Sequence, residues 1–417
     1  MEFVDLGLAE PLLRAIDGAG YATPTPIQER AIPSIIAGRD VLGCAQTGTG
    51  KTAAFALPIL HRLLADPLPR KARRWIRVLI LSPTRELAAQ IGDNFQQYAR
   101  RTKLRETVIF GGVGQSAQTR ALEAGVDVVI ATPGRLLDLM NQGYVDLRSV
   151  ETFVLDEADQ MLDMGFLPDV KRIIAKLPKD RQTLFFSATM PPGIRQLADQ
   201  ILTDPVSVQI APQGVTADRV DQEVYLVEQT RKPALLAHFL ATRPPGSTLV
   251  FSRTKHGADA VVRRLNKAGI PALAIHGNKS QNNRQRSLNQ FKSGEVEILV
   301  ATDIAARGID VSGINYVINY DMPNLPETYV HRIGRTGRAG EAGIAVSFCN
   351  SEERIHLRAI EKQLKKKLPV AADALDLADP AAAPLKTEPA AAPRRGPSTR
   401  SRGARSTPKP SSRRRRS

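Results

Sequence analysis

Short apolar runs rich in β-branched residues alternate with helical patterns along most of this chain of 417 residues. The runs fall into two blocks, and the first contains 78–81, 107–110, 126–130, 153–155, 183–186 and 206–208. The second block contains 224–227, 248–251, 272–275, 298–301, 316–319 and 344–348. Strands that alternate with helices favour a parallel sheet covered on both faces. The pattern therefore predicts an α/β fold with two tandem domains, each a mostly parallel sheet flanked by helices.

Changes in composition predict the domain boundaries. We expect a first domain over 1–210 and a second over 219–368, joined by a linker over 211–218 that is rich in turn-forming residues. From 369 to 417 alanine, proline, serine and arginine dominate and aromatic residues are absent. Such a segment buries too little apolar surface to offset the entropy lost on ordering, so we expect 369–417 to be disordered.

The positive charge of the chain is concentrated near its C-terminus. The net charge is +16, and the stretch from Pro393 to Ser417 holds nine arginines, one lysine and no acidic residue. These residues alone contribute +10, and the rest of the chain about +6. The sequence therefore predicts a tail that binds a polyanion such as RNA as a non-specific tether. The alternative is a solubilising extension.

Several classes of protein are disfavoured by composition. No run approaches the roughly 18 uninterrupted apolar residues of a membrane span, and the N-terminus has neither a basic start nor an apolar signal core. Cys44 and Cys349 supply neither a disulfide framework nor zinc spacing. We therefore expect a cytoplasmic protein with two reduced thiols and no membrane partner.

A phosphate-binding loop lies between an apolar run that ends at Cys44 and a helical run that follows residue 52. Glycines in such a loop let backbone N–H groups approach phosphate oxygens, Lys51 would reach the β- and γ-phosphates, and Thr52 would place its hydroxyl on Mg²⁺. The strict pattern begins with glycine, and Ala45 departs from it. The alternative is a chance turn, which the flanking strand and helix disfavour. The nucleotide-binding residues predicted here are Ala45, Gln46, Thr47, Gly48, Thr49, Gly50, Lys51 and Thr52.

A second motif is acidic: Asp156-Glu157-Ala158-Asp159 follows the buried strand predicted over 152–155. Asp156 would be the second metal-holding group, and Glu157 would orient or deprotonate water. The alternative is an exposed helix start, where acidic residues favour the helix dipole. Together with the phosphate loop, the motif predicts hydrolysis of a nucleoside triphosphate.

Four motifs occur in one order, and together they resemble a known family. They are the phosphate loop, Asp156-Glu157-Ala158-Asp159, Ser187-Ala188-Thr189 and His331-Arg332-Ile333-Gly334-Arg335-Thr336-Gly337-Arg338. The chain resembles a DEAD-box ATP-dependent RNA helicase of superfamily 2 over about residues 3–368. The segments from Phe3 to Leu8 and from Ile360 to Pro369 resemble the bacterial RhlE-like subgroup of that family. The resemblance implies two RecA-like domains, RNA-stimulated ATP hydrolysis, and ATP and Mg²⁺ as cofactors.

The resemblance also implies how the adenine is recognised. The segment Gly20–Gln28 is similar to the Q motif of the family. Gln28 has the amide donor and acceptor that the N6/N7 edge of adenine requires, and Phe3 matches the aromatic residue that stacks on the base. Taken alone, Phe3 would be read as a core residue and Gln28 as a surface helix residue.

Further roles come from the same resemblance. Arg335 and Arg338 look like the arginines that reach the γ-phosphate from the second domain, so we expect them to act in catalysis with Lys51 and Glu157. Asp310 matches the residue of the family that contacts the ribose. The alternatives for 331–338 are an exposed basic turn or a direct contact with RNA phosphate. The residues expected to couple the ATP site to the domain interface are Asp159, Ser187, Thr189 and His331.

The predicted RNA contacts follow predicted strands in both blocks, where an open parallel sheet forms a binding rim. Hydroxyls, glycine amides and arginines donate well to phosphate. In the first block they are Pro83, Thr84, Arg85, Gly111, Gly112, Thr132, Pro133 and Arg135. In the second they are Arg253, Gly277, Gln281, Arg284 and Thr302. Contacts to sugar and phosphate imply low sequence specificity, and a contact to the 2′-OH would favour RNA over DNA.

Because these residues are split between the two blocks, we expect ATP and RNA together to close the domains and to bend one strand, so that a few base pairs separate. One alternative is a DNA-directed helicase of the same superfamily. Another is an ATP-gated RNA clamp or annealing chaperone with little true unwinding. Resemblance to RhlE-like proteins suggests ribosome assembly or RNA decay as the setting.

Overall fold

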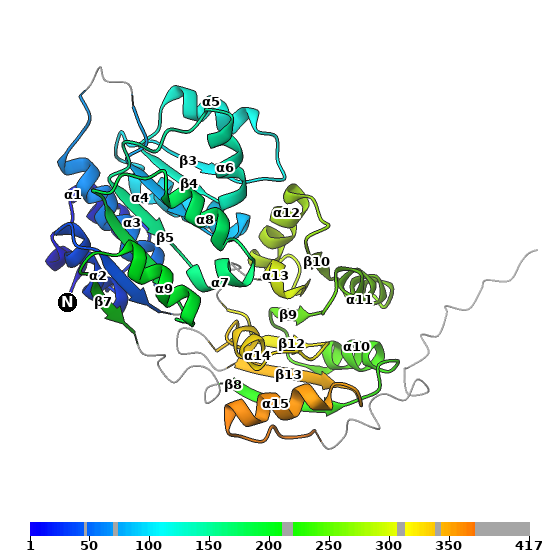
Figure 1. Cartoon of the computed structure of the whole chain (residues 1–417). Helices are drawn as coiled ribbons and strands as arrows, with labels where there is room; N and C mark the ends of the chain where they lie inside the picture. Colours follow the sequence, from blue (N-terminus) through cyan, green and yellow to red (C-terminus); the bar gives the residue numbers. More distant parts are fainter. Residues whose placement is uncertain (46–47, 70–73, 211–219, 307–312, 338–342, 372–417) are drawn as a thin grey trace, which may run out of the picture. The chain divides into compact units, whose positions relative to one another are not determined.

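The computed structural model contains two β-sheets, one in each predicted domain (Figure 1). It describes residues 1–45, 48–69, 74–210, 220–306, 313–337 and 343–371. The predicted linker, 211–218, and the predicted disordered tail from 372 onwards lie outside these residues. All strand pairs in the two sheets of the described residues are parallel, which confirms the predicted α/β class.

The first sheet has seven strands in the order β3-β4-β2-β5-β6-β1-β7. Their bounds are β1 Val41–Cys44, β2 Val78–Leu81, β3 Glu106–Ile109, β4 Val128–Ala131, β5 Thr152–Leu155, β6 Gln182–Ser187 and β7 Val206–Gln209. The helices of this domain are α1 Glu10–Gly18, α2 Pro26–Ile36, α3 Lys51–Ala65, α4 Arg85–Ala99, α5 Ser116–Ala124, α6 Pro133–Asn141, α7 Ala158–Asp163, α8 Leu167–Ile174 and α9 Pro192–Ile201, preceded by a 3₁₀ turn, Phe3–Leu6.

The second sheet has six strands in the order β10-β11-β9-β12-β13-β8. Their bounds are β8 Val220–Leu226, β9 Thr248–Phe251, β10 Leu273–Ile275, β11 Ile298–Ala301, β12 Tyr316–Asn319 and β13 Gly343–Cys349. The helices are α10 Lys232–Thr242, α11 Lys255–Lys267, α12 Gln281–Lys292, α13 Asp303–Ala306, α14 Pro326–Ile333 and α15 Arg354–Leu364.

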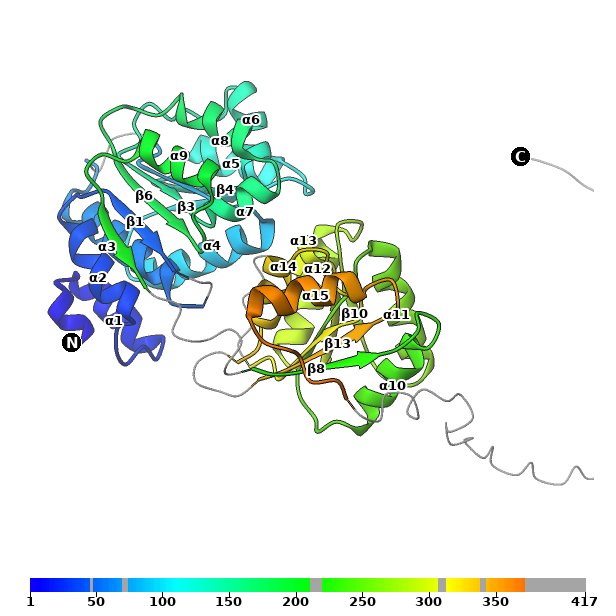
Figure 2. The same ribbon diagram turned by 60° about the horizontal axis from the view of Figure 1, so that its bottom comes forward.

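Helices cover both faces of each sheet (Figure 1, Figure 2). In β2, Val78 and Ile80 pack with α2, α3 and α4, whereas Leu79 and Leu81 pack with α6, α8 and α9 on the other face. In the second sheet, α10 and α11 cover one face and α12 to α15 the other. A strand buried on both faces needs apolar residues at every position, which is why the strands read as continuous apolar runs.

The C-terminal end of the second domain differs from the prediction. The sequence from Glu352 to Leu368 has a helical pattern and predicts a helix over that whole range. The observed helix, α15, ends at Leu364 because Lys365 takes a left-handed conformation, with φ 52°. The chain then returns to β8, where Val224 N–H donates to Pro369 O at 2.9 Å and Ala371 N–H donates to Val224 O at 3.0 Å. Pro369 and Ala371, which follow the predicted domain boundary at 368, are therefore hydrogen-bonded to the second sheet.

Candidate functional site

The strand order of the first sheet brings the nucleotide motifs to one edge. β5, β6 and β1 are neighbours, and Leu155 pairs with Phe185 while Cys44 pairs with Ser187. Because parallel strands end at the same edge of a sheet, the segments that follow them lie side by side. The phosphate loop, Asp156-Glu157-Ala158-Asp159 and Ser187-Ala188-Thr189 therefore meet there.

A cavity of about 340 Å³ lies at this edge. Lys51 and Thr52 at the start of α3 form part of its wall, together with Asp156 and Glu157 after β5. Gly48, Gly50 and Gln28 also line it, so the structure brings these predicted nucleotide-site residues together. Gln46 and Thr47 lie outside the described residues.

The phosphate loop presents a buried cation at a helix N-terminus. Lys51 is 6% exposed, and its Nζ donates to Ala45 O at 2.9 Å. The N-terminus of α3 adds the positive end of a helix dipole at the same place. Gly48 and Gly50 have φ values of 85° and 91°, which glycine adopts without strain. A loop of this shape and charge favours a bound anion such as phosphate.

The Q-motif segment is hydrogen-bonded directly to the phosphate loop. Gln28, 3% exposed, accepts from Thr25 N–H at 2.9 Å and donates from Nε2 to Gly50 O at 3.1 Å. The sequence placed Gln28 at the nucleotide but did not anticipate this contact with Gly50. Its predicted role in reading adenine stays a prediction.

Two tyrosines that the sequence did not single out also line the cavity. Tyr21 and Tyr98 both contribute to its wall, and their hydroxyl oxygens are 2.9 Å apart. Phe3 is buried and stacks on Tyr21 with 6.3 Å between ring centroids. The structure therefore places Tyr21 between Phe3 and the cavity. Tyr98 could not be found from sequence, because it lies on the apolar face of α4 like any core residue.

Asp156 and Thr52 supply oxygen donors that suit Mg²⁺. Burial raises the pKa of Asp156, which is 2% exposed, and the nearby Lys51 ammonium acts in the opposite direction. A neighbouring cation stabilises the charged form of a buried carboxylate of this kind. No group of three or more histidine, cysteine or acidic residues that could hold a metal occurs among the described residues. Thr52 and Asp156 would hold Mg²⁺ by one oxygen each, with phosphates and water completing its shell.

Glu157 occupies a strained backbone position. Its φ of 53° and ψ of 52° place it in the left-handed region just before α7, and it is 2% exposed. Its N–H donates to Asp156 Oδ1 at 3.0 Å. Strain of this kind in a non-glycine residue costs about 1–3 kcal/mol and persists where the surroundings impose it. Here it turns the chain sharply from β5 into α7, with both acidic side chains at the cavity.

Three of the four predicted coupling residues form one hydrogen-bonded network. Asp159 Oδ2 accepts from the backbone N–H of Thr189 at 2.8 Å and from its hydroxyl at 2.9 Å. Asp159 N–H donates to Ser187 Oγ at 3.2 Å, and that hydroxyl donates to Thr189 O at 2.7 Å. The acidic motif is therefore tied to the segment after β6. The fourth residue, His331, lies exposed in the last turn of α14 in the second domain.

The basic run at the end of α14 contains residues with different environments. Arg332 is 3% exposed and forms two ion-pair contacts with Asp303, at 2.6 and 2.8 Å, which hold it inside the second domain. Arg335, which is predicted to reach the γ-phosphate, is 8% exposed in the turn after α14. Arg338 and Asp310 lie outside the described residues.

The predicted RNA contacts of the first domain gather at the ends of three neighbouring strands, β3, β4 and β2. A Cβ at Gly112 would overlap Arg85 Nη1, so this glycine packs directly against that guanidinium. Arg135 Nη2 donates to Val113 O at 3.3 Å, next to the same glycine turn. Thr84 caps α4, accepting from Leu87 N–H at 3.2 Å. The remaining residues of this set, Pro83, Gly111, Thr132 and Pro133, belong to the same three turns.

The second domain repeats this arrangement at the ends of β10, β11 and β9, which are neighbours in the sheet. Gly277 follows β10, Thr302 follows β11 and Arg253 follows β9, while Gln281 and Arg284 lie in the first turn of α12. Arg253 Nη2 donates to Met322 O at 3.2 Å and to Glu353 Oε1 at 2.7 Å. The sequence did not anticipate these partners.

Comparison with known proteins agrees with the motifs. A sequence model of the DEAD/DEAH box helicase family matches residues 25–197, and a model of the helicase conserved C-terminal domain matches residues 231–340. The ATP-dependent RNA helicase CshA of Limosilactobacillus reuteri is 44% identical over 368 residues, which cover 88% of this chain and 73% of that protein. The chain belongs to the DEAD-box ATP-dependent RNA helicases.

Other members of the family are similar over most of the chain. The DEAD-box ATP-dependent RNA helicase RhpA of Helicobacter pylori is 41% identical over 366 residues, 88% of this chain and 73% of that protein. The structure of S. cerevisiae Dbp5 bound to RNA and ADP BeF3 is similar to this DEAD-box chain, with a TM-score of 0.77 and 32% identity. The match covers 91% of this chain and 100% of that chain. Mss116p bound to ssRNA and AMP-PNP gives 0.78 at 27% identity, over 90% and 80% of the two chains. The likeness confirms two RecA-like domains; the RhlE-like subgroup stays a prediction.

Proposed function

We propose that this DEAD-box protein is a cytoplasmic RNA-dependent ATPase that separates short RNA duplexes when ATP closes its two RecA-like domains. The observation that carries the proposal is the single cavity that contains Lys51, Asp156 and Glu157. Asp159, two residues after Glu157, accepts from Thr189 N–H at 2.8 Å, so the acidic motif at the cavity is connected to the segment after β6.

The chemistry of ATP hydrolysis follows from the residues around the cavity. Lys51 and the loop amides bind the β- and γ-phosphates, and Thr52 and Asp156 would hold Mg²⁺, which neutralises phosphate charge when bound. Glu157 orients the attacking water and accepts its proton. Arg335 and Arg338 of the second domain stabilise the charge that develops in the transition state. Closure of the domains completes the site, so hydrolysis depends on RNA.

RNA would be held by its backbone along the strand ends of both domains. Hydroxyls, glycine amides and arginines at these edges donate to phosphate and sugar, which gives low sequence specificity. A strand gripped in this way follows a bent path that a duplex cannot follow. Ribosome assembly and RNA decay are proposed settings that stand on the resemblance to RhlE-like proteins.

Nucleic-acid specificity tests the proposal. We expect single-stranded RNA to stimulate ATP hydrolysis by about tenfold to a hundredfold, as is typical of coupled sites, and single-stranded DNA of the same sequence to stimulate it far less. The measurement is steady-state ATPase with each polymer, followed by unwinding of blunt and tailed short RNA duplexes. Equal stimulation by DNA contradicts the RNA assignment, and annealing without unwinding favours the ATP-gated clamp.

Removal of residues 393–417 tests the proposed tether. The segment carries ten positive charges, nine arginines and one lysine. We expect the truncated protein to bind RNA more weakly with a shallower salt dependence, because log K falls by about 0.7 per neutralised phosphate of a single strand per unit of log salt. RNA affinity is measured at several salt concentrations. A chain with the nine arginines replaced by lysine serves as control and should keep the slope. An unchanged slope after truncation supports a solubilising extension instead.

A further inference from the structure

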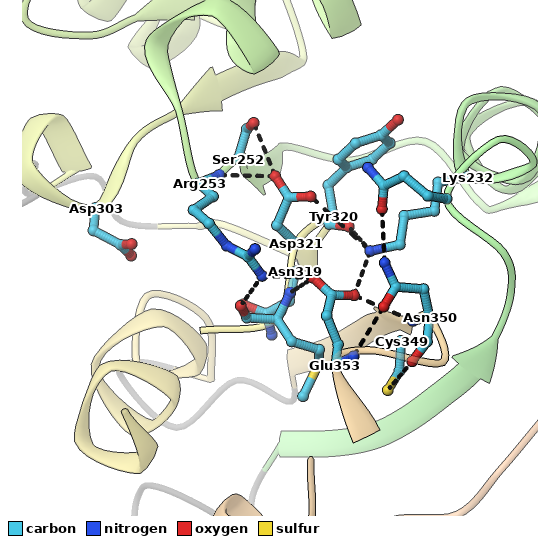
Figure 3. A network of polar contacts seen from close by, with 12 residues as sticks. Lys232, Ser252, Arg253, Asp303, Asn319, Tyr320, Asp321, Cys349, Asn350 and Glu353 are labelled. Atoms are coloured by element: carbon cyan, nitrogen blue, oxygen red, sulfur yellow. Dashed lines mark hydrogen bonds and ion pairs between the residues drawn. The ribbon is translucent and has the colours of Figure 1, made fainter. Parts of the chain in front are cut away.

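Two cations and two carboxylates form a polar cluster at the strand ends of the second sheet (Figure 3). We call Lys232, Arg253, Asp321 and Glu353 the Glu353 cluster. Lys232 begins α10, Arg253 follows β9, Asp321 follows β12 and Glu353 lies just before α15. β9, β12 and β13 are successive neighbours in the sheet, so this cluster lies along the edge that carries the predicted RNA contacts of the domain.

Glu353 is the centre of the cluster, between Lys232 and Arg253 (Figure 3). Its Oε1 accepts from Arg253 Nη2 at 2.7 Å and from Met322 N–H at 3.2 Å. Its Oε2 accepts from Lys232 Nζ at 2.6 Å and from Asn350 N–H at 3.2 Å. The residue is 4% exposed. Four donors around one buried carboxylate hold it in a single orientation.

Lys232 balances the charge of Glu353 through its direct contact with Oε2. It is fully buried, at 0% exposure, and also donates to Tyr320 O at 2.9 Å. An ammonium at a helix N-terminus opposes the helix dipole, so it depends on the carboxylate beside it. A well-packed apolar pair of similar volume would stabilise the fold at least as well as such a buried ion pair. The distinct contribution of the pair is therefore to fix a charged group in place.

Arg253 is the member that reaches the surface. Its backbone N–H donates to Asp321 Oδ2 at 2.8 Å, and its side chain is 46% exposed. In the described part of the chain, Nη2 makes both hydrogen bonds of the guanidinium, to Met322 O and Glu353 Oε1, and Nε and Nη1 make none. A polar cavity of about 360 Å³ opens beside it, lined also by Gln229, Asn350 and His356. The guanidinium of Arg253 is thus anchored through Nη2, and its Nε and Nη1 can donate to an external oxygen acceptor.

We propose that Glu353, with Lys232 as its buried counter-charge, is a positioning residue that holds the guanidinium of Arg253 in the orientation that contacts RNA phosphate. The inference deepens the proposed function and rests on it. Glu353 itself touches no RNA in this arrangement. Glu353 also connects the start of α15 to the sheet edge that carries the predicted RNA contacts. Neither the motifs nor the composition indicated this connection.

The test compares RNA dependence of the ATPase in single and double variants of the full chain. We expect Arg253→Ala to raise the RNA concentration at half-maximal ATPase by about tenfold, since one charge-assisted phosphate contact is lost. Glu353→Gln should raise it about threefold to fivefold, because the guanidinium keeps its charge but loses its charged anchor. Turnover at saturating RNA should stay close to that of the parent in Glu353→Gln, because Glu353 itself touches no RNA. A purely structural defect would instead lower turnover.

The double variant decides whether Glu353 acts through Arg253. If it does, adding Glu353→Gln to Arg253→Ala does not raise the half-saturating RNA concentration further. The increases caused by the two single substitutions then do not multiply in the double variant. The matched control is Glu352→Gln, an exposed neighbour of the same charge that lines the same cavity, and it should leave the half-saturating RNA concentration unchanged. The proposal is wrong if Glu353→Gln raises the half-saturating RNA concentration by the same factor in the parent protein and in the Arg253→Ala variant. Tighter RNA binding by Glu353→Gln, as expected from removing a negative charge beside phosphate, overturns it too.

A second variant covers the case in which Glu353→Gln leaves Lys232 unpaired and destabilises the fold. Lys232→Met combined with Glu353→Gln removes both buried charges and should show the same rise in half-saturating RNA, with melting temperature measured alongside. If Arg253→Ala leaves RNA dependence unchanged while RNA still stimulates hydrolysis, the inference is wrong and the proposed function stands. If RNA does not stimulate the parent protein, the proposed function fails and this inference fails with it.

Discussion

Replacing Glu157 with glutamine is expected to leave ATP binding intact and to slow hydrolysis by about 10²- to 10⁴-fold, the contribution typical of a positioned general base. The substitution keeps the size of a side chain that is 2% exposed and lines the cavity with Lys51 and Asp156. What it removes is the negative charge that orients water and accepts its proton. The measurement is single-turnover ATP hydrolysis with saturating RNA, with ATP binding determined separately by calorimetry.

The control for this substitution is Glu123→Gln on α5, an exposed residue of the same domain. It makes the same chemical change away from the cavity and should hydrolyse ATP at the parent rate. A Glu157→Gln protein that turns over ATP like this control would show that another group handles the water. A protein that fails to bind ATP would show instead that Glu157 supports the nucleotide or the turn before α7.

Replacing Gly50 with alanine is expected to lower ATP affinity by about 10²-fold, because a displaced loop loses a hydrogen bond to a charged phosphate, which contributes about 1.5–3 kcal/mol. A Cβ there would lie 2.5 Å from Gln28 Nε2 and 2.9 Å from Thr25 Oγ1. Gln28 cannot easily yield, since its amide is buried and hydrogen-bonded to Thr25 N–H and Gly50 O. The φ of 91° adds strain of about 1–2 kcal/mol for any residue with a Cβ.

Gly38→Ala separates the two effects of that substitution. Gly38 has a φ of 79°, and a Cβ there would meet no atom within 4 Å. Both alanine variants should lose stability through backbone strain, whereas only Gly50→Ala should lose ATP binding. Melting temperature and ATP affinity are measured on both. Equal ATP affinity in the two proteins would show that the close packing of Gln28 against Gly50 does not support ATP binding.

The parts of the molecule that were predictable from sequence are those that depend on neighbours in the chain. Both sheets follow from apolar runs, and the runs over 248–251, 298–301 and 316–319 coincide with β9, β11 and β12. The strand before the phosphate loop and the helix after it were also expected, although α3 continues to Ala65. The predicted end of α15 at residue 368 was wrong, because one left-handed residue, Lys365, ends the helix at Leu364.

Side-chain partners distant in sequence were not predictable. Tyr98 lines the nucleotide cavity beside Tyr21, from which it is separated by 77 positions. Glu353 accepts from Lys232 across 121 positions and from Arg253 across 100. Each of these residues has an ordinary interpretation in its own helix or turn. Only the order of strands in the sheet brings their side chains together.

The sequence by itself determined the class of fold, the family, and the residue types that nucleotide chemistry requires, because glycine spacing, acidic motifs and apolar runs are properties of short segments. The tertiary structure decided which of those residues share a cavity and what holds them there. It placed Tyr21 between Phe3 and the cavity, tied Gln28 to Gly50, and anchored Arg253 on Glu353. These contacts exist only once parallel strands align their ends at one edge of each sheet, and the pairing of strands is a property of the whole domain.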